Sequence, residues 1–482
     1  MMTQVDAARP RAPRRLFRPA TWGLVLGAGL ILSACGDETI LPGERFDTRV
    51  PLAETERGAV DTGPTDAARP ISLPAARALS SWGMRGYDAQ NRTPHAALGG
   101  SLTEVWTTGI GRGNSRRLRL TADPVADAGR VFTLDAQAGL QATSLSSGEA
   151  LWRVSLEPGF DRGGSISGGG LAVAGGRLFA TTGFGELVAL DPATGNVIWR
   201  QRLEAGIGAP TVSGGTVYVV SRDNRAWAID AATGRLDWEV PSAPAQAVLA
   251  GGAAPAVTDR VVIFPFGSGE LVASLRNSGV RLWSTAVAGG RLGVAYSNIN
   301  DITGDPVVLG GTVYTGNQSG RVIALDADTG ARRWTAIEGS YSPVLVAGGS
   351  LFFVSDRNEL IRLDAANGAR VWGTELPLYV RERERRRRAV FTHYGPILAG
   401  GRLLVASGES ATAPVLTRIR SAAGDGALAR RGGGGAHRRQ RHAAGRHRRR
   451  APERLSLRRD QTNQRSRAVS ETPSHPPIRH AP

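Results

Sequence analysis

Few residues in this chain have side chains that could carry out chemistry. Cys35 is the only cysteine in 482 residues, and the 7 histidines show no metal-ligand spacing. The acidic residues fall mostly in repeated turns, and no separate carboxylate cluster stands out. We therefore expect no catalytic residue, no metal site and no bound cofactor.

Cys35 closes the run Leu32-Ser33-Ala34-Cys35. A basic segment with Arg9 and Arg18 comes first, followed by an apolar stretch over 20–32 that is short for a membrane span. Small residues before such a cysteine are typical of a bacterial lipobox, in which the thiol accepts a diacylglyceryl group. We interpret residues 1–34 as a lipoprotein signal peptide and Cys35 as the lipidated residue. The alternative is a plain secretory signal with an incidental cysteine.

The residue after Cys35 indicates the membrane. An Asp there favours retention in the inner membrane, whereas this chain has Gly36. We therefore expect an outer-membrane protein, lipid-anchored and facing the periplasm. Residues 35–80 are rich in Pro, Thr, Asp and Arg with little apolar periodicity, and we interpret them as a flexible tether.

A repeat dominates residues 81–408. The segment Ala189-Leu190-Asp191-Pro192-Ala193-Thr194-Gly195-Asn196-Val197-Ile198-Trp199 recurs over 228–238 and 324–334, and more loosely over 273–283 and 363–372. Alternating residues before the Asp predict a strand, and the Asp and Gly suit a tight turn. A second strand then carries the Trp, whose large apolar ring suits a seam between stacked sheets.

A constant spacing orders these units. Gly-Gly pairs that begin at residues 175, 214, 310 and 348 each stand 24 residues before a Trp, as do Ala128-Gly129 and Asp259-Arg260. Gly-Gly loops suit the primed turns of β-hairpins. Four strands per unit predict an all-β fold, a β-propeller. Trp106, these six units and a last one begun at Gly400-Gly401 predict eight blades, the last apparently incomplete.

The motif Ala-x-Asp-x-x-Thr-Gly-x-x-x-Trp resembles the repeat of pyrroloquinoline quinone (PQQ) enzymes. Together with the lipobox and the number of units, it makes the chain similar to the BamB family of the outer-membrane β-barrel assembly machinery. The resemblance runs from the lipobox to about Gly408. It implies a non-enzymatic scaffold that assists the folding and insertion of outer-membrane proteins.

The resemblance also implies a partner, the barrel-assembly protein BamA with other subunits of that complex. Family members contact it through a Leu-rich loop ending in Arg and a later loop with two Asp. Here Leu249 and Asp301 keep two of these positions, whereas Ala250 and Thr303 replace the Arg and the second Asp. Leu249 and Asp301 are the predicted partner-binding residues. The alternative for Leu249 is an ordinary turn residue.

The same repeat serves enzymes, so a PQQ-dependent periplasmic dehydrogenase is the alternative function. Such enzymes usually carry a vicinal cysteine pair and Glu, Asn and Asp ligands for Ca²⁺. With Cys35 as the only cysteine, no vicinal pair can form. We therefore expect no enzyme activity.

Two arginine-rich segments remain. The run over 381–388 interrupts the short loops; it is either a solvated loop or a contact with an acidic partner or anionic headgroups. Residues 409–482 carry 17 Arg against five acidic residues, so most of the net charge of +17 lies there. We expect no nucleic-acid partner for the folded part.

The tail over 409–482 loses the repeat pattern abruptly. Shifted forward by one nucleotide, the codons of residues 418–421 can read Ala-Phe-Asp-Pro, and those of 428–431 Leu-Pro-Gly-Gly. The codons of 440–445 can read Ser-Gly-Thr-Leu-Leu-Val, and those of 453–455 Ser-Ala-Phe. We interpret the tail as translated in a shifted frame. The alternative is a disordered basic tail that binds RNA, DNA or lipid.

Overall fold

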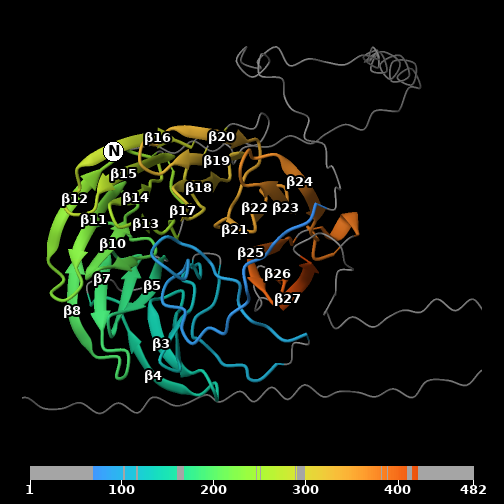
Figure 1. The fold of residues 1–482 in the computed structure, drawn as a ribbon. Coiled ribbons are helices and arrows are strands. Elements are labelled where there is room, and N and C mark those ends of the chain that lie inside the picture. The colour runs from blue at the N-terminus through green and yellow to red at the C-terminus, as the bar shows by residue number, and fades with distance from the viewer. Residues whose placement is uncertain are drawn as a thin grey trace, which may run out of the picture. The chain divides into compact units, whose positions relative to one another are not determined.

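The computed structural model describes residues 69–421, apart from 101–103, 116–117, 160–167, 246, 250, 288, 290–298, 382, 388 and 410–414. These residues belong to one compact unit. Their strands form seven antiparallel sheets that follow one another around a centre (Figure 1). The β-propeller prediction is confirmed.

Each sheet uses consecutive strands. Sheet 1 contains β1 (Val125–Asp127), β2 (Arg130–Leu134), β3 (Gly139–Ser144) and β4 (Ala150–Ser155); sheet 2 contains β5 (Gly169–Ala174), β6 (Arg177–Thr182), β7 (Glu186–Leu190) and β8 (Val197–Arg202). Sheet 3 contains β9 (Thr211–Ser213), β10 (Thr216–Val220), β11 (Arg225–Asp230) and β12 (Leu236–Pro241); sheet 4 contains β13 (Ala256–Val257), β14 (Val261–Pro265), β15 (Glu270–Leu275) and β16 (Arg281–Ala286).

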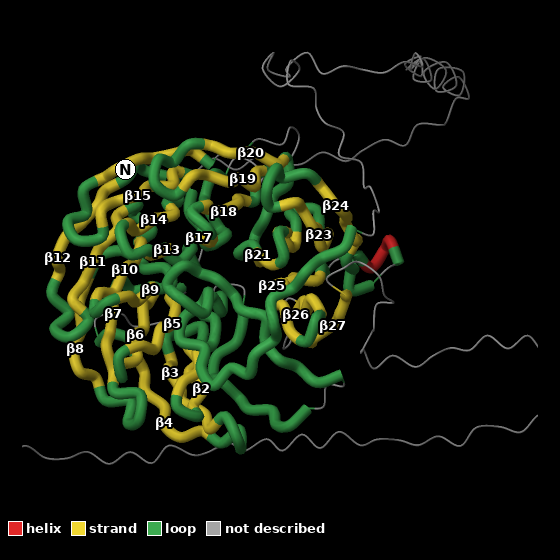
Figure 2. The backbone as a smooth tube through the Cα atoms, in the orientation of Figure 1, coloured by secondary structure: helices red, strands yellow, loops and turns green. Residues whose placement is uncertain are grey.

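Sheet 5 contains β17 (Val307–Leu309), β18 (Thr312–Asn317), β19 (Arg321–Asp326) and β20 (Arg332–Ala336); sheet 6 contains β21 (Leu345–Ala347), β22 (Ser350–Val354), β23 (Glu359–Asp364) and β24 (Arg370–Glu375). Sheet 7 contains three described strands, β25 (Phe391–Ala399), β26 (Arg402–Glu409) and β27 (Val415–Ser421). The helix η2 (Glu384–Arg386) lies at the outer edge of the ring, beyond β24 (Figure 2).

The predicted turns form as expected. Both residues of the pair Gly214-Gly215 have positive φ, 55° and 80°, as a primed hairpin requires. In the Asp turns, the Asp191 carboxylate accepts the backbone N–H groups of Ala193 and Thr194 at 2.7 and 2.9 Å. These bonds lower the pKa of Asp191, so its role is to stabilise the turn.

The Trp residues fill the seams between sheets, as predicted. The Trp199 ring lies 2.7 Å from where a Cβ on Gly234 of the next sheet would stand, and its Nε1–H donates to Ala231 O at 3.2 Å. The Trp residues at 152, 283 and 334 combine the same Gly contact with the same kind of hydrogen bond. Only glycine leaves room for the ring at this point of the turn.

Trp106 makes the same contacts although its segment belongs to none of the described sheets. Its ring lies 2.7 Å from where a Cβ on Gly148 would stand, and its Nε1–H donates to Leu145 O at 3.0 Å. Trp106 therefore covers the turn of sheet 1 as the other Trp residues cover the turn of the sheet that follows them. The described residues form seven sheets, so the eighth predicted sheet stays a prediction.

An axial segment, residues 82–96, crosses the centre of the ring (Figure 1). Trp82 pairs with Ala126 of sheet 1, and Ala96 pairs with Ala399 of sheet 7. Between them, the carbonyls of Ala89 and Gln90 accept N–H groups from Val257 of sheet 4 and Val308 of sheet 5, at 2.6 and 3.0 Å. Nothing in the repeat predicts this segment.

Two predicted boundaries change. Ile71 and Leu73 pack against the buried core of sheets 6 and 7, so the tether prediction is wrong for the last residues before 81. Sheet 7 includes β27, beyond the predicted propeller end at Gly408. Residues 1–68, with Cys35 and the predicted signal peptide, lie outside the described part, as do residues 422–482.

Candidate docking site

Chain connectivity assigns the predicted partner loops to one face of the ring. The strands of each sheet are consecutive and antiparallel, so the chain enters and leaves a four-stranded sheet at the same end. That end also carries the turn between the second and third strands. Leu249 lies in the link from β12 to β13, Asp301 in the link from β16 to β17, and the arginine run in the link from β24 to β25. The Asp-Thr-Gly turns lie at the opposite end.

The structure joins the two predicted partner-binding residues directly. The Leu249 N–H donates to Asp301 Oδ2 at 2.7 Å, across 52 residues of sequence. Leu249 is half-buried, whereas Asp301 is only 3% exposed. Asp301 thus presents little surface to a partner, and its carboxylate holds the loop that carries Leu249.

Asp301 is held at an electrostatic cost. Burial raises its pKa to about 6, although the Leu249 N–H and the charge of Arg222 act in the opposite direction. Burial of Arg222 lowers the pKa of its guanidinium, and the negative charge of Asp301 acts in the opposite direction. Arg222 lies between β10 and β11 of sheet 3, and sequence reasoning did not select it, because the two residues meet only after sheets 3 and 4 have packed.

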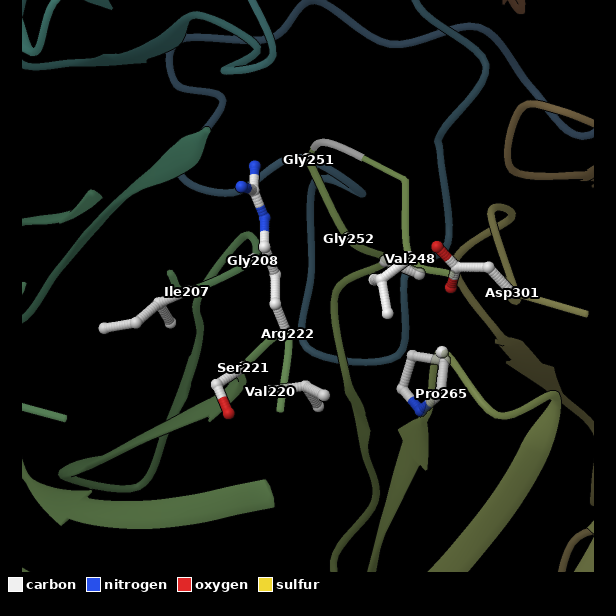
Figure 3. Close-up of a pocket in the computed structure, with 12 residues that line it drawn as sticks. Ile207, Gly208, Val220, Ser221, Arg222, Val248, Gly251, Gly252, Pro265 and Asp301 are labelled. Carbon is white, nitrogen blue, oxygen red and sulfur yellow. The ribbon is translucent and has the colours of Figure 1, made fainter. Parts of the chain in front are cut away.

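A small cavity lies beneath these loops (Figure 3). It measures about 20 Å³, and its lining includes Arg222, Val248, Gly252, Pro265 and Asp301. Arg222 reaches toward the loop of Gly251, while Asp301 points toward Val248 (Figure 3). This volume suits a single water molecule and is far too small for a quinone cofactor.

The other positions of the family pattern differ. Thr303, which replaces the second Asp, donates its hydroxyl to Ser340 O at 3.0 Å and so ties its loop to the link between β20 and β21. Ala250, which replaces the Arg, lies outside the described residues.

The axial segment brings a partly buried arginine, Arg85, beside this site. The Arg85 Nη1–H donates to Gly252 O at 3.0 Å and lies 3.4 Å from Asp305 Oδ1, while Nε lies 2.8 Å from Asp123 Oδ2. Burial disfavours the Arg85 charge, but Asp305 and Asp123 outweigh it and raise the Arg85 pKa. One guanidinium therefore links the segments that lead into sheets 1, 4 and 5.

The arginine run forms a short arm, residues 378–391, at the outer edge. At its base, the Phe391 N–H donates to Leu378 O at 2.9 Å, and Val380 N–H donates to Ala389 O at 3.1 Å. The Arg387 guanidinium carbon lies 4.9 Å from the centre of the Tyr379 ring. Arg383 and Arg385 are exposed.

Within the described ranges, no group of three or more His, Cys, Asp or Glu residues could hold a metal ion. The same part of the chain contains no helix long and apolar enough to cross a membrane.

Comparison with known proteins places this ring in a family. A family model described as outer membrane protein assembly factor BamB matches residues 136–374. The chain belongs to the BamB family. The BamB of Moranella endobia (strain PCIT) is 28% identical over 253 residues, and that of Bordetella pertussis is 27% identical over 267 residues. These matches cover 50% and 54% of this chain, and 64% and 66% of the two relatives.

A solved structure agrees with the fold. The crystal structure of BamB from Moraxella catarrhalis superposes with a TM-score of 0.51 at 18% sequence identity, covering 67% of this chain and 92% of that one. This structure agrees with the propeller fold, and the family model agrees with the PQQ-like repeat predicted from the Asp-Thr-Gly turns. The matched part still spans less than two thirds of the Moranella and Bordetella relatives.

Proposed function

We propose that this chain is a non-enzymatic scaffold lipoprotein of the outer-membrane β-barrel assembly complex. It is anchored to the outer membrane through Cys35, faces the periplasm, and assists barrel-protein folding and insertion by docking a BamA-like protein. The relatives from Moranella and Bordetella are named outer membrane protein assembly factors. The lipobox sequence at Leu32–Cys35 supports the anchor.

One observation favours a scaffold over a dehydrogenase. The centre of the ring is occupied by the chain's own axial segment, with Arg85 held against Asp305 and Gly252. Asn91 adds hydrogen bonds from its side-chain amide to Pro255 O at 3.2 Å and Pro306 O at 3.0 Å. A quinone bound on this axis would have to displace buried charges from their partners, which costs several kcal/mol.

The docking face in this proposal is the one that carries Leu249. The half-buried Leu249 side chain supplies an apolar contact, and Asp301 positions its loop through the 2.7 Å hydrogen bond. A few well-packed, desolvated side chains carry most of the affinity of such an interface, and in this proposal Leu249 is one of them.

Binding to the periplasmic domains of a BamA-like protein, measured with Leu249→Asp, tests this face. Leu236→Asp is the matched control, because Leu236 is a 41% exposed leucine at the opposite end of sheet 3. We expect Leu249→Asp to weaken binding by at least about tenfold, a loss of ~1.4 kcal/mol, and Leu236→Asp to leave it unchanged. Equal binding by both variants would exclude this face.

A dehydrogenase makes a separate prediction. Titration of the purified chain with PQQ and Ca²⁺ should give no tight binding and no dye reduction. Quinone-dependent reduction of the dye would overturn the scaffold function.

A further inference from the structure

The arm over 378–391 is fixed to the ring at its base. The Leu376 N–H donates to Asn358 O at 2.9 Å, and the Asn358 side-chain amide donates back to Leu376 O at 2.8 Å. The His393 ring donates its Nε2–H to Pro377 O at 2.9 Å. The arm therefore has a defined position on sheets 6 and 7, and it extends outward beyond β24 (Figure 2).

The tip of the arm, residues 381–388, is strongly basic. Six of these residues are Arg and two are Glu, which gives a net charge of +4. The arginines of the tip whose side chains are exposed are Arg381, Arg383, Arg385 and Arg387. On the outer strand of sheet 4, by contrast, Arg281 lies 3.3 Å from a carboxylate oxygen of Glu270. Two glutamates cannot neutralise six arginines, so the tip presents excess positive charge to solvent.

Apolar and aromatic side chains flank this charged tip. Leu378 and Val390 are 43% and 46% exposed. Tyr379 pairs with Val390 across the arm, and the Arg387 guanidinium carbon lies 4.9 Å from the centre of the Tyr379 ring. Guanidinium groups bind phosphates through two parallel hydrogen bonds, and Tyr is enriched at membrane–water interfaces. The tip and its flanks therefore have the chemistry of a surface that binds lipid headgroups.

The segment that leads from the predicted lipid anchor joins the ring at the sheet that also carries the arm. Arg69 forms an ion pair with Asp364, the last residue of β23 in sheet 6, and Arg362 Nη1–H donates to Arg69 O at 2.7 Å. The arm leaves the same sheet after β24. A flexible tether of the 33 residues over 36–68, as their composition predicts, has an end-to-end distance of roughly 30 Å. A strand of six residues such as β23 spans only about 20 Å, so a membrane that holds Cys35 lies within reach of the arm.

We propose that the tip of the arm is a membrane-binding site for the phosphate headgroups of anionic lipids. The arginines bind the phosphates, while Leu378 and Val390 enter the apolar boundary beside them. The site turns the outer edge of sheet 6 toward the membrane. An acidic protein surface would match the charge as well, but the predicted anchor places a membrane, and no particular protein, beside sheet 6. This inference rests on the lipid anchor of the proposed function and does not require docking to a BamA-like protein.

The test places a fluorescent label on the arm of the full chain and measures its quenching by lipids that carry a quencher on the headgroup. Val390→Cys carries the label, and Ala193→Cys is the matched control, because Ala193 is exposed in the Asp turn of sheet 2. Both chains also contain Cys35→Ser, so that the added thiol alone is labelled. The Arg-rich residues over 409–482 can hold either chain on an anionic vesicle. Quenching of the arm label beyond that of the control therefore reports contact by the arm itself.

We expect vesicles of phosphatidylglycerol and phosphatidylethanolamine to quench the label of the Val390→Cys chain but not that of the Ala193→Cys chain. Vesicles of phosphatidylcholine alone should quench neither label. Adding Arg383→Gln and Arg385→Gln should lower the ratio of quenched to unquenched arm labels at least about tenfold, because each arginine near an anionic surface contributes roughly a factor of five. The matched pair Arg235→Gln and Arg260→Gln removes the same charge from exposed turns of sheets 3 and 4 and should leave this ratio unchanged.

Equal quenching of the two labels by anionic vesicles, or no quenching of the arm label, would overturn the proposal. So would an arm label that responds to poly-glutamate but not to anionic vesicles, because this result would identify an acidic protein as the partner. The assay depends on neither Cys35 nor Leu249. Its failure is therefore distinct from a failure of lipidation or of docking in the proposed function.

Discussion

Replacement of Asp301 by Asn removes the buried negative charge but keeps the hydrogen bond, so it separates the contributions of the two to the unfolding free energy. The Asn side-chain oxygen still accepts the Leu249 N–H, which Asp301 Oδ2 now accepts at 2.7 Å. The charge disappears, and with it the penalty of keeping a carboxylate at 3% exposure. Asp301→Asn should therefore stabilise the ring at neutral pH.

The magnitude follows from the pKa. Burial raises the pKa of Asp301 from 3.8 to about 6, so the folded chain binds this proton more tightly than the unfolded chain. The stabilisation by this proton is fully present below pH 4 and is lost as pH rises through 6. A shift of roughly two units corresponds to about 3 kcal/mol at pH 7. The difference in unfolding free energy, variant minus parent, should grow by about that amount from pH 4 to pH 7.

Urea unfolding of both chains at several pH values between 4 and 7 measures this difference. The contributions of the other carboxylates to the pH dependence are the same in both chains and cancel in the difference. Asp230→Asn is the control, because hydrogen bonds from Thr233 lower the pKa of Asp230. The stabilisation by this carboxylate is present above its ordinary pKa and is lost only as pH falls through the lowered pKa, so the difference for Asp230→Asn should change little between pH 4 and pH 7. A pH-independent difference for Asp301→Asn would show that the Asp301 carboxylate is not desolvated, and the argument would fail.

Three further variants test other parts of the molecule. Gly234→Ala places a Cβ 2.7 Å from the Trp199 ring at a φ of +76° and should lower the unfolding free energy by about 2–4 kcal/mol. The control Gly215→Ala, with a φ of +80° and nothing within 4 Å of its Cβ, should lower it by only about 1–2 kcal/mol. Equal losses in denaturant unfolding would contradict the packing of the Trp199 ring against Gly234. Cys35→Ser should release the chain from outer-membrane fractions, and a variant that stays there would contradict lipidation. If the arm is solvated, replacing Arg383 and Arg385 with Gln should change the unfolding free energy by less than about 0.5 kcal/mol. It should also leave the salt dependence of binding to anionic vesicles unchanged, whereas weaker binding at low salt would show contact with headgroups.

The repeat could be predicted from sequence because its determinants are local. Gly214-Gly215 and the turn of Asp230 each act within a few residues, and the 24-residue spacing to Trp238 reports two hairpins of fixed length. The same local pattern recurs in sheet after sheet. Because these residues recur at the same positions in several sheets, they can be recognised as structural residues and not as chance occurrences.

The candidate site could be predicted only in part. Resemblance to the family selected Leu249 and Asp301, but not their hydrogen bond, because it joins residues 52 positions apart. Arg222 and Arg85 carry no local signal, since each depends on a carboxylate from another sheet or link. The axial segment occurs once and has no apolar period, so no repeat analysis could find it.

The axial segment also sets an order of events in folding. A chain synthesised from its N-terminus contains residues 82–96 before any described sheet. Trp82 finds its partner Ala126 in sheet 1, but other partners come late. Asn91 bonds to Pro306, 215 residues away, and His95 Nε2 accepts the Gly401 N–H, 306 residues away. Closing loops of this length before the sheets exist would cost entropy without any compensating contact. The part of the axial segment that contains Asn91 and His95 is therefore made before the sheets but can complete its hydrogen bonds only after sheets 5 and 7 have formed.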